Sequence, residues 1–270
     1  MPKRIAAAKL LTTMTVICLV ACGGGSSGGP AAPATPSLPG VVSGDSWSLR
    51  FDGFNDVGIT GNYGSAVPLA ALEGSFTGLV GPVNAVMQPF GNCFAPEGPL
   101  VRFTGTRSGG NLDMQSQPVE GQVVRITGLL AETEDAGQVL SGTYTITGGC
   151  GGGRTGKVTG SSVNLTGTWK GTMGAVPAVF QLQMSKTPAE DGSYVLTGTA
   201  TLTDTPCLNG AVITRYARGR VLVADVASDG QRLELKGEIS QDHYTMHVEF
   251  VLVAGTCPEL ALNSGRLVRQ

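Results

Sequence analysis

The sequence contains little charge, few aromatic residues and almost no histidine. Charged residues make up 14% of the 270 residues and aromatic residues 6%, with two His and two Trp. This composition is not typical of a helical protein, and Gly shows no period of three, so long amphipathic helices, coiled coils and collagen are excluded. Glycine is abundant at 41 residues, about twice its usual share, and Thr recurs within short apolar runs. We therefore expect an all-β chain of short strands joined by tight turns.

The N-terminus has the pattern of an export signal. A basic head at positions 3 and 4 precedes an apolar run over residues 10–20, which is too short to span a bilayer as a helix. The run ends in Leu19-Val20-Ala21-Cys22, which resembles the lipobox of bacterial lipoproteins. The resemblance implies cleavage before Cys22 and attachment of diacylglycerol to its thiol. The alternative is an ordinary signal peptide in which Cys22 is incidental.

A tether follows the proposed lipid site. Residues 23–29 contain only Gly and Ser, a flexible composition, and the Pro-rich residues 30–39 are stiffer. Several acyl chains hold a protein stably on a bilayer, so we expect the membrane to be a partner through this anchor. Lipoproteins with Asp after the lipidated Cys stay at the inner membrane, and here Gly23 follows. The resemblance thus implies the outer membrane of a Gram-negative cell, facing the periplasm or the cell surface.

Net charge and cysteine content indicate which classes of partner, cross-link and metal site to expect. Without the signal the chain has 15 basic and 20 acidic residues, a formal charge of −5, so we do not expect nucleic acid as a partner. Removing Cys18 with the signal and assigning Cys22 to lipid leaves four cysteines in an oxidising compartment, where disulfides form. With no CxxC pair and two His, we expect no metal site, and nothing indicates a cofactor.

An internal repeat selects one of the three possible disulfide pairings. Trp47 and Trp169 each open a unit, and a Gly-Ser-aromatic strand, a Cys, an alternating strand ending in Gly and a second Cys then follow in the same order. The repeat predicts these pairs: Cys93 with Cys150, and Cys207 with Cys257. The expected organisation is a signal peptide over 1–21, the lipidated Cys and tether over 22–44, and two tandem β domains over 45–162 and 163–270.

Eight strands are readable in the second domain. They are expected at 165–173, 178–186, 194–203, near 211, and at 221–227, 232–239, 243–253 and 266–269. Eight sequential antiparallel strands suit a small up-and-down barrel or a meander sandwich. The first domain reads similarly, with longer connections and one helical turn at Leu69–Glu73. In the 243–253 strand we expect Tyr244, Met246, Val248, Phe250 and Leu252 to face inward.

Two segments of the second domain carry a weak family resemblance. Leu165-Thr166-Gly167-Thr168-Trp169 and Tyr194-Val195-Leu196-Thr197-Gly198-Thr199 resemble the first and third strands of avidin-like barrels, and the former is more loosely similar to the Gly-x-Trp start of lipocalins. The resemblance implies a barrel. Avidins surround biotin with further tryptophans that this chain lacks, so biotin is not implied. We expect Trp47 and Trp169 in the cores, the alternative being the aromatic lining of a binding mouth.

Several short segments match known catalytic or binding motifs in sequence but lack the structural context that these motifs need. Gly151, Gly153 and Gly156 fit GxGxxG and nearly fit a phosphate-binding loop, but no helix pattern follows, so we expect a glycine loop beside a disulfide. A GxSxG match over residues 24–28 lies in the tether and is accidental. His243 and His247 lie on one predicted strand, about 13 Å apart, and cannot share a metal ion. We expect both to be exposed.

Three function classes stay open. A non-enzymatic binding module of the envelope, with an unknown small molecule or envelope protein as its ligand, is the leading hypothesis, because no catalytic constellation is visible. A structural or envelope-maintenance role is the alternative. An enzyme would have to use carboxylates such as Glu73, Glu97 or Asp113. An enclosed apolar cavity would favour small-ligand binding, a filled core with exposed apolar side chains would favour protein partners, and a cleft with convergent carboxylates would favour catalysis.

Overall fold

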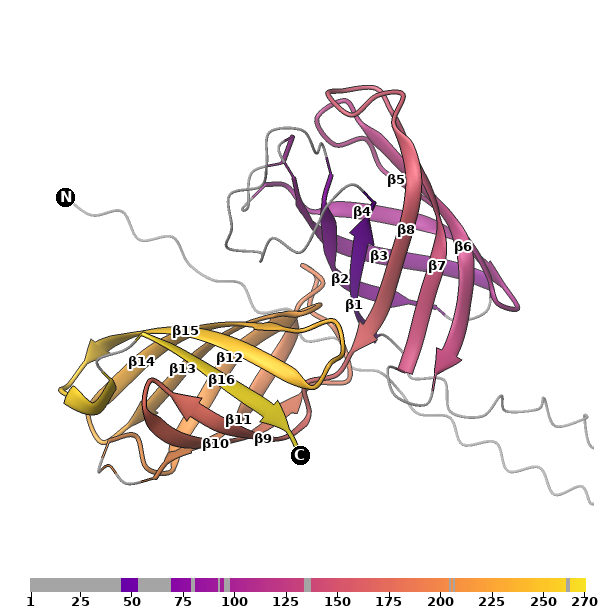
Figure 1. Cartoon of the computed structure of the whole chain (residues 1–270). Coiled ribbons are helices and arrows are strands. Elements are labelled where there is room, and N and C mark those ends of the chain that lie inside the picture. Colours follow the sequence, from indigo (N-terminus) through magenta and orange to yellow (C-terminus); the bar gives the residue numbers. More distant parts are fainter. Residues whose placement is uncertain are drawn as a thin grey trace, which may run out of the picture. The chain divides into compact units, whose positions relative to one another are not determined.

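The computed structural model describes residues 45–52, 69–78, 81–91, 93–94, 98–133, 137–203, 205, 207–260 and 263–270. Within these residues sixteen strands form two closed, eight-stranded antiparallel barrels that follow one another along the chain (Figure 1). The all-β prediction is confirmed, and the barrel is the correct choice between barrel and sandwich. The signal, Cys22 and the tether lie outside the described residues.

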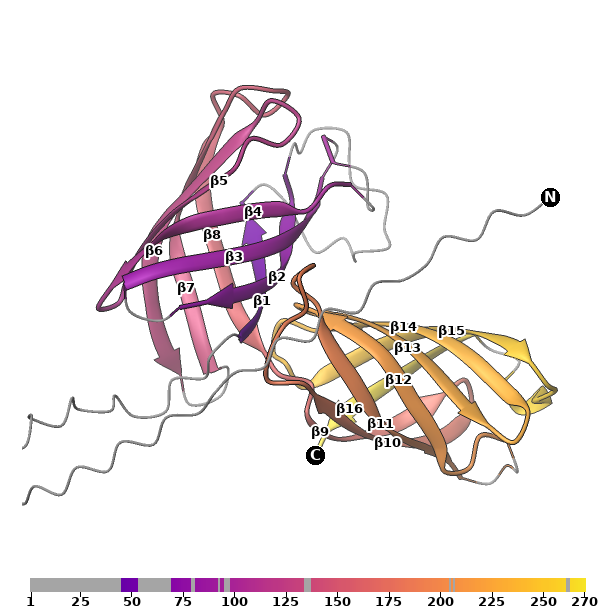
Figure 2. The same ribbon diagram turned by 180° about the vertical axis from the view of Figure 1, so that it is seen from behind.

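The first barrel is an up-and-down meander in which each strand pairs with the next (Figure 2). Its strands are β1 (Asp45–Phe51), β2 (Ala71–Thr77), β3 (Gly81–Phe90), β4 (Val101–Ser108), β5 (Asn111–Ser116), β6 (Val123–Thr133), β7 (Gly137–Thr147) and β8 (Thr155–Val163). The barrel closes where β8 pairs with β1, with Val163 opposite Ser46. Its last strand therefore ends one residue beyond the predicted boundary at 162.

The helical turn predicted at Leu69–Glu73 is wrong. Residues 71–73 open strand β2, where Leu72 lies opposite Leu49 of β1 on one side and opposite Pro89 of β3 on the other. Ladder hydrogen bonds on both sides satisfy the backbone of this segment, which a single helical turn would leave largely unpaired. The local sequence is misleading because Leu69-Ala70-Ala71-Leu72 consists of residues with high helix propensity, whereas pairing with β1 and β3 decides the structure.

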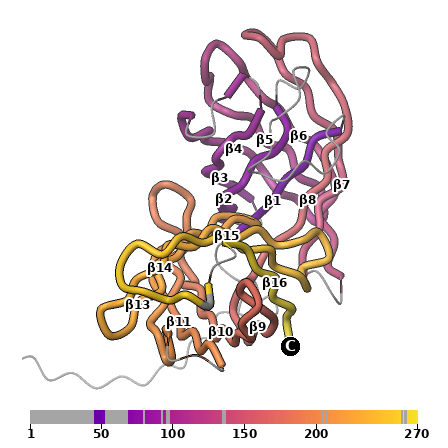
Figure 3. The backbone as a smooth tube through the Cα atoms, turned by 60° about the vertical axis from the view of Figure 1, so that its left-hand side comes forward, coloured from indigo at the N-terminus to yellow at the C-terminus, as the bar shows by residue number. Residues whose placement is uncertain are grey.

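The second barrel repeats the same topology. Its strands are β9 (Gly167–Met173), β10 (Val176–Met184), β11 (Tyr194–Leu202), β12 (Ala211–Arg218), β13 (Val221–Ser228), β14 (Gln231–Ile239), β15 (Thr245–Ala254) and β16 (Ser264–Arg269), with a 3-10 turn η1 (Pro258–Leu260) before β16. All eight predicted strands are present, and the short piece near Ala211 is a full strand. The tube in Figure 3 follows the meander in sequence order.

Inward-facing apolar side chains form a buried core in each barrel. Trp47 and Trp169 are 2% and 0% exposed and belong to the cores of the first and second barrels, as predicted. Trp47 packs on Phe76 with ring centroids 5.0 Å apart, and Trp169 Nε1 donates a hydrogen bond to the Leu165 carbonyl at 3.0 Å. The high glycine content follows partly from close strand packing, because a Cβ on Gly198 would collide with the backbone of β10.

The two disulfides occupy equivalent places. The structure joins Cys93 to Cys150 and Cys207 to Cys257, the pairing that the repeat predicts. Each bond links the segment between the third and fourth strands of its barrel to the segment between the seventh and eighth strands. These segments are four strands apart in an eight-stranded ring, so each bond spans one end of its barrel. Neither disulfide connects one barrel to the other.

Candidate functional site

The outward face of β1 and β2 carries polar side chains that are buried. Trp47 and Leu49 point into the first barrel, so their neighbours Ser46 and Ser48 point out of it. Ser46, Ser48 and the outward-facing Glu73 are nonetheless 1%, 2% and 0% exposed. A barrel wall facing water would alternate between buried and exposed residues, so this wall is covered.

The hairpin between β12 and β13 lies on this wall, within the one compact unit that residues 40–270 form. The Gly219 N–H donates to Ser46 Oγ at 2.7 Å, and the Arg220 N–H donates to Glu73 Oε2 at 2.8 Å. Gly219 has a φ of 54°, and a Cβ there would collide with the Glu73 carboxylate and lie 2.6 Å from the Trp47 carbonyl oxygen. Glycine is thus required both by the backbone conformation and by the contact.

Four charged side chains form a network around this hairpin. Glu73 accepts hydrogen bonds from Ser48 Oγ at 3.0 Å and from the Arg50 guanidinium. Glu238 of the second barrel lies 3.2 Å from Arg220 and 3.8 Å from Arg50. Each barrel contributes one carboxylate and one guanidinium, so the charges of this partly buried network balance.

Two further contacts widen this interface. Arg218 Nη1 donates to Gln88 Oε1 of β3 at 3.4 Å, while its Nη2 is 2.6 Å from Asp191 Oδ2. Burial alone would raise the pKa of Asp191, but the hydrogen bonds from Ser193 and Arg218 and the charge of Arg218 outweigh it and lower the pKa. The hairpin between β14 and β15 reaches β8 through His243. The contact thus extends over the neighbouring strands β8, β1, β2 and β3 of the first barrel.

The prediction of two exposed histidines is wrong for His243 and correct for His247. His243 is 7% exposed, and its Nε2 lies 2.9 Å from Ser161 Oγ of β8. Burial lowers the pKa of His243, and the nearby Arg220 and Arg269 lower it further. Its φ of 64° places it in a turn rather than a strand.

The same turn explains a second error. The alternation predicts that Tyr244 faces inward with Met246, Val248, Phe250 and Leu252, but Tyr244 is 45% exposed. Strand β15 begins only at Thr245, so the alternation does not extend back to Tyr244. Met246, Val248 and Phe250 are buried as predicted, and Leu252 is partly buried and packs against the core of the second barrel.

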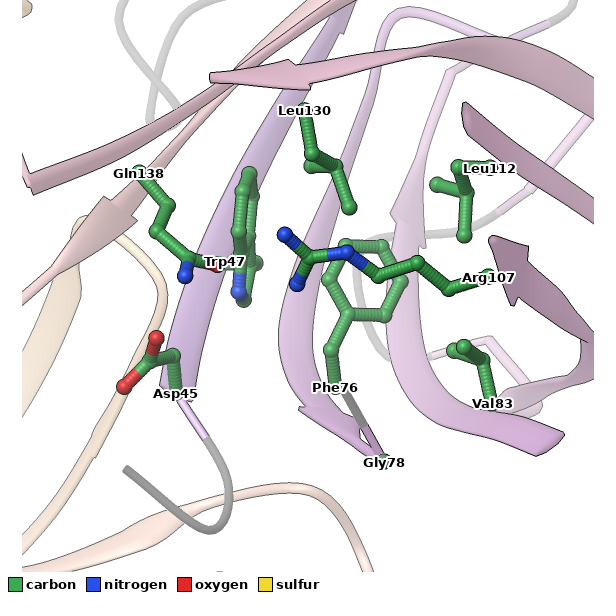
Figure 4. A pocket seen from close by; sticks show the side chains of 9 residues that line it. All are labelled: Asp45, Trp47, Phe76, Gly78, Val83, Arg107, Leu112, Leu130 and Gln138. Carbon is green, nitrogen blue, oxygen red and sulfur yellow. The ribbon is translucent and has the colours of Figure 1, made fainter. Parts of the chain in front are cut away.

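The mouth of the first barrel, at the end away from its disulfide, is nearly closed. Trp47 and Phe76 form its floor, and the Arg107 side chain extends across it toward Trp47 (Figure 4). The remaining space is about 10 Å³, room for roughly one water molecule. Asp45 lies at the rim, where burial raises the pKa of its carboxyl group. The mouth therefore has no room for a small organic ligand.

A shallow groove of about 450 Å³ lies on the outside of the first barrel. A row of polar residues crosses it from β4 to β7, each paired with the next: Thr106, Asp113, Thr127 and Thr143. Leu129, 58% exposed, is its largest exposed apolar side chain. Asp113 forms an exposed ion pair with Arg125 at 2.7 Å, and the hydrogen bond from Arg125 lowers the pKa of Asp113.

The carboxylates considered for catalysis do not converge. Glu73 is part of the network between the barrels, and Asp113 lies on the outer groove, with β3 and β4 between their strands. Glu97 lies outside the described residues. Within the described part of the chain no three His, Cys, Asp or Glu side chains are grouped to hold a metal ion.

The glycine-rich motif is a loop, as predicted. Residues 148–153 form bends and turns beside the Cys93–Cys150 disulfide, and strand β8, not a helix, follows at Thr155. The segment therefore lacks the helix N-terminus that a phosphate-binding loop uses. The network between the barrels could not be found from the sequence, because nothing near Ser46, Ser48 or Glu73 indicates contact with residues of the second barrel.

Comparison of the chain with protein-family models, with curated proteins and with solved structures gives no match. No helix among the described residues is long and apolar enough to cross a membrane.

Proposed function

We propose that the chain is a lipid-anchored binding module of the bacterial envelope, which engages a macromolecular partner through the outer walls of its barrels. The observation that carries this proposal is the nearly closed mouth of the first barrel. Buried side chains occupy both barrels, and the mouth of the first retains about 10 Å³, whereas pockets for small organic ligands measure roughly 300–1,000 Å³. The likeness to avidin-like and lipocalin-like barrels therefore supports an architecture and not an interior ligand.

Features of the outer surface also support a partner there. The groove on β4–β7 combines hydroxyl and carboxylate groups with the exposed Leu129. Exposed apolar side chains lie on the second barrel too, including Val195 at 56% and Val251 at 64%. Apolar side chains surrounded by polar groups are typical of protein contact surfaces. Anchoring through Cys22 and the tether, at the outer membrane, would present these walls to envelope components.

Photo-crosslinking in the native envelope tests this proposal. A crosslinking amino acid at Leu129 should give one discrete adduct, and Thr127→Arg, which fills the groove, should abolish it. The same amino acid at Gln117, which is exposed between β5 and β6 and does not line the groove, serves as the positional control. A Leu129 adduct that persists unchanged in Thr127→Arg, or its absence from intact envelopes, would argue against recognition through the groove.

A structural role is the second candidate, favoured by the partly buried network of charged side chains that joins the barrels. A spacer would tolerate Thr127→Arg but would lose function when residues 23–39 are shortened. A binding module would lose function in Thr127→Arg but would tolerate the shortened tether. Complementation of a deletion strain with the two variants, scored by envelope permeability, separates these two functions.

A further inference from the structure

His243 occupies an unusual position among the titratable groups of this chain. It is 7% exposed in the β14–β15 hairpin, and its hydrogen-bond partner, Ser161 Oγ at 2.9 Å, belongs to the other barrel. The charged groups that face the ring are Asp242 from its own turn, Arg220 from the β12–β13 hairpin and Arg269 from β16. Strand β8 presents the uncharged Ser161. Two cations and one anion thus surround a ring that lies against the first barrel.

A proton on this ring would be unfavourable in the joined arrangement. The imidazolium would be placed close to Arg220. The Arg220 guanidinium is 3.2 Å from Glu238, and the Arg220 backbone N–H donates a hydrogen bond to Glu73. Asp242 already accepts hydrogen bonds from Ser240 Oγ and the Tyr244 N–H. An added positive charge in this partly desolvated place costs free energy that a hydrated histidine does not incur.

We propose that His243 is a pH sensor that loosens the contact between the two barrels as the surroundings become acidic. The direction of the pH effect follows from the thermodynamic linkage between protonation of His243 and the contact between the barrels. Burial and the two arginines depress the pKa of His243 in the joined form, and an unperturbed histidine has a pKa of about 6.5. The contact therefore keeps its full strength above pH 6.5, and weakens as pH falls from 6.5 toward the depressed pKa.

Hydrogen exchange measured by NMR reads this contact directly, because the amides of Gly219 and Arg220 donate across it. In the full chain, the protection factors of these amides should fall between pH 8 and pH 5.5, by up to about tenfold per pH unit below 6.5. The amide of Phe250 in the core of the second barrel should keep its protection, which distinguishes loosening from unfolding.

The two histidines provide a matched pair of variants. His243→Asn should remove the pH dependence, since Asn tolerates the positive φ of this turn. His247→Asn, four residues away and exposed, should behave as the wild type. Equal pH dependence in His243→Asn and wild type would overturn the proposal.

A second measurement decides the question if His243→Asn weakens the contact at every pH. In wild-type protein the midpoint of the loss of Gly219 and Arg220 protection should coincide with the titration of the His243 ring followed by NMR. Loss of protection centred instead on the carboxylate range near pH 4 would refute a role for His243. Unchanged protection down to pH 5.5 would refute it equally.

Discussion

Replacing Gly219 with Ala should separate the barrels without unfolding either of them. Gly219 has a φ of 54°, so Ala there costs about 1–2 kcal/mol in backbone conformation whether or not the barrels touch. The new methyl group would also collide with the Glu73 carboxylate and lie 2.6 Å from the Trp47 carbonyl oxygen. The hairpin must then move off β1 and β2.

The loss can be estimated from the two hydrogen bonds that cross at this hairpin. The bond from the Gly219 N–H to Ser46 is between neutral groups and contributes about 1 kcal/mol. The bond from the Arg220 N–H to the Glu73 carboxylate contributes about 2 kcal/mol. Together they amount to about 3 kcal/mol, so the equilibrium between joined and separated barrels should shift about a hundredfold.

The first barrel supplies a matched control in Gly109. This residue takes the equivalent place in the β4–β5 hairpin, with a φ of 59°, but a Cβ there would meet nothing within 4 Å. Gly109→Ala should therefore cost the first barrel only the backbone term and leave the contact intact. Hydrogen exchange of the Arg220 amide is the assay. A hundredfold loss of protection in Gly219→Ala and none in Gly109→Ala is expected, and equal protection in the two variants would refute the reasoning.

Cys22→Ser should move the protein from the membrane fraction to the soluble fraction, and continued membrane retention would exclude lipidation at this residue. The fluorescence of Trp47 and Trp169, both in the cores, should resist acrylamide quenching until the chain is denatured; strong quenching of the native protein would contradict their burial. A fragment over 162–270, exported to an oxidising compartment, should fold alone as a β-rich monomer with no free thiol. The reason is that its core cluster and its disulfide lie between Val163 and Leu267. A free thiol, or the circular dichroism spectrum of an unfolded chain, would show that the fragment needs the first barrel.

The strands of the second barrel could be predicted because one face of each strand packs in the core and the other face is exposed to solvent. Alternation over residues 178–186 and 232–239 marks β10 and β14, and the Ser228-Asp229-Gly230 turn marks the hairpin before β14. The disulfides could be predicted because the repeat places equivalent cysteines in equivalent connections. Local periodicity and order along the chain carry this information.

The contact between the barrels could not be predicted because it depends on residues far apart in sequence. Ser46 and Gly219 are 173 positions apart, and nothing near either signals the other. The same contact buries Glu73 on the outer face of β2. It also buries His243, which the local pattern assigns to solvent.

The proposal that recognition occurs outside the barrels is tested most directly by native mass spectrometry of the protein released gently from its host envelope. The mass should equal that of the lipidated chain with two disulfides, alone or with a macromolecular partner, and denaturation should release no small molecule. A small organic molecule retained in the folded chain and released on unfolding would contradict the account, because the barrel interiors would then have to open to hold it.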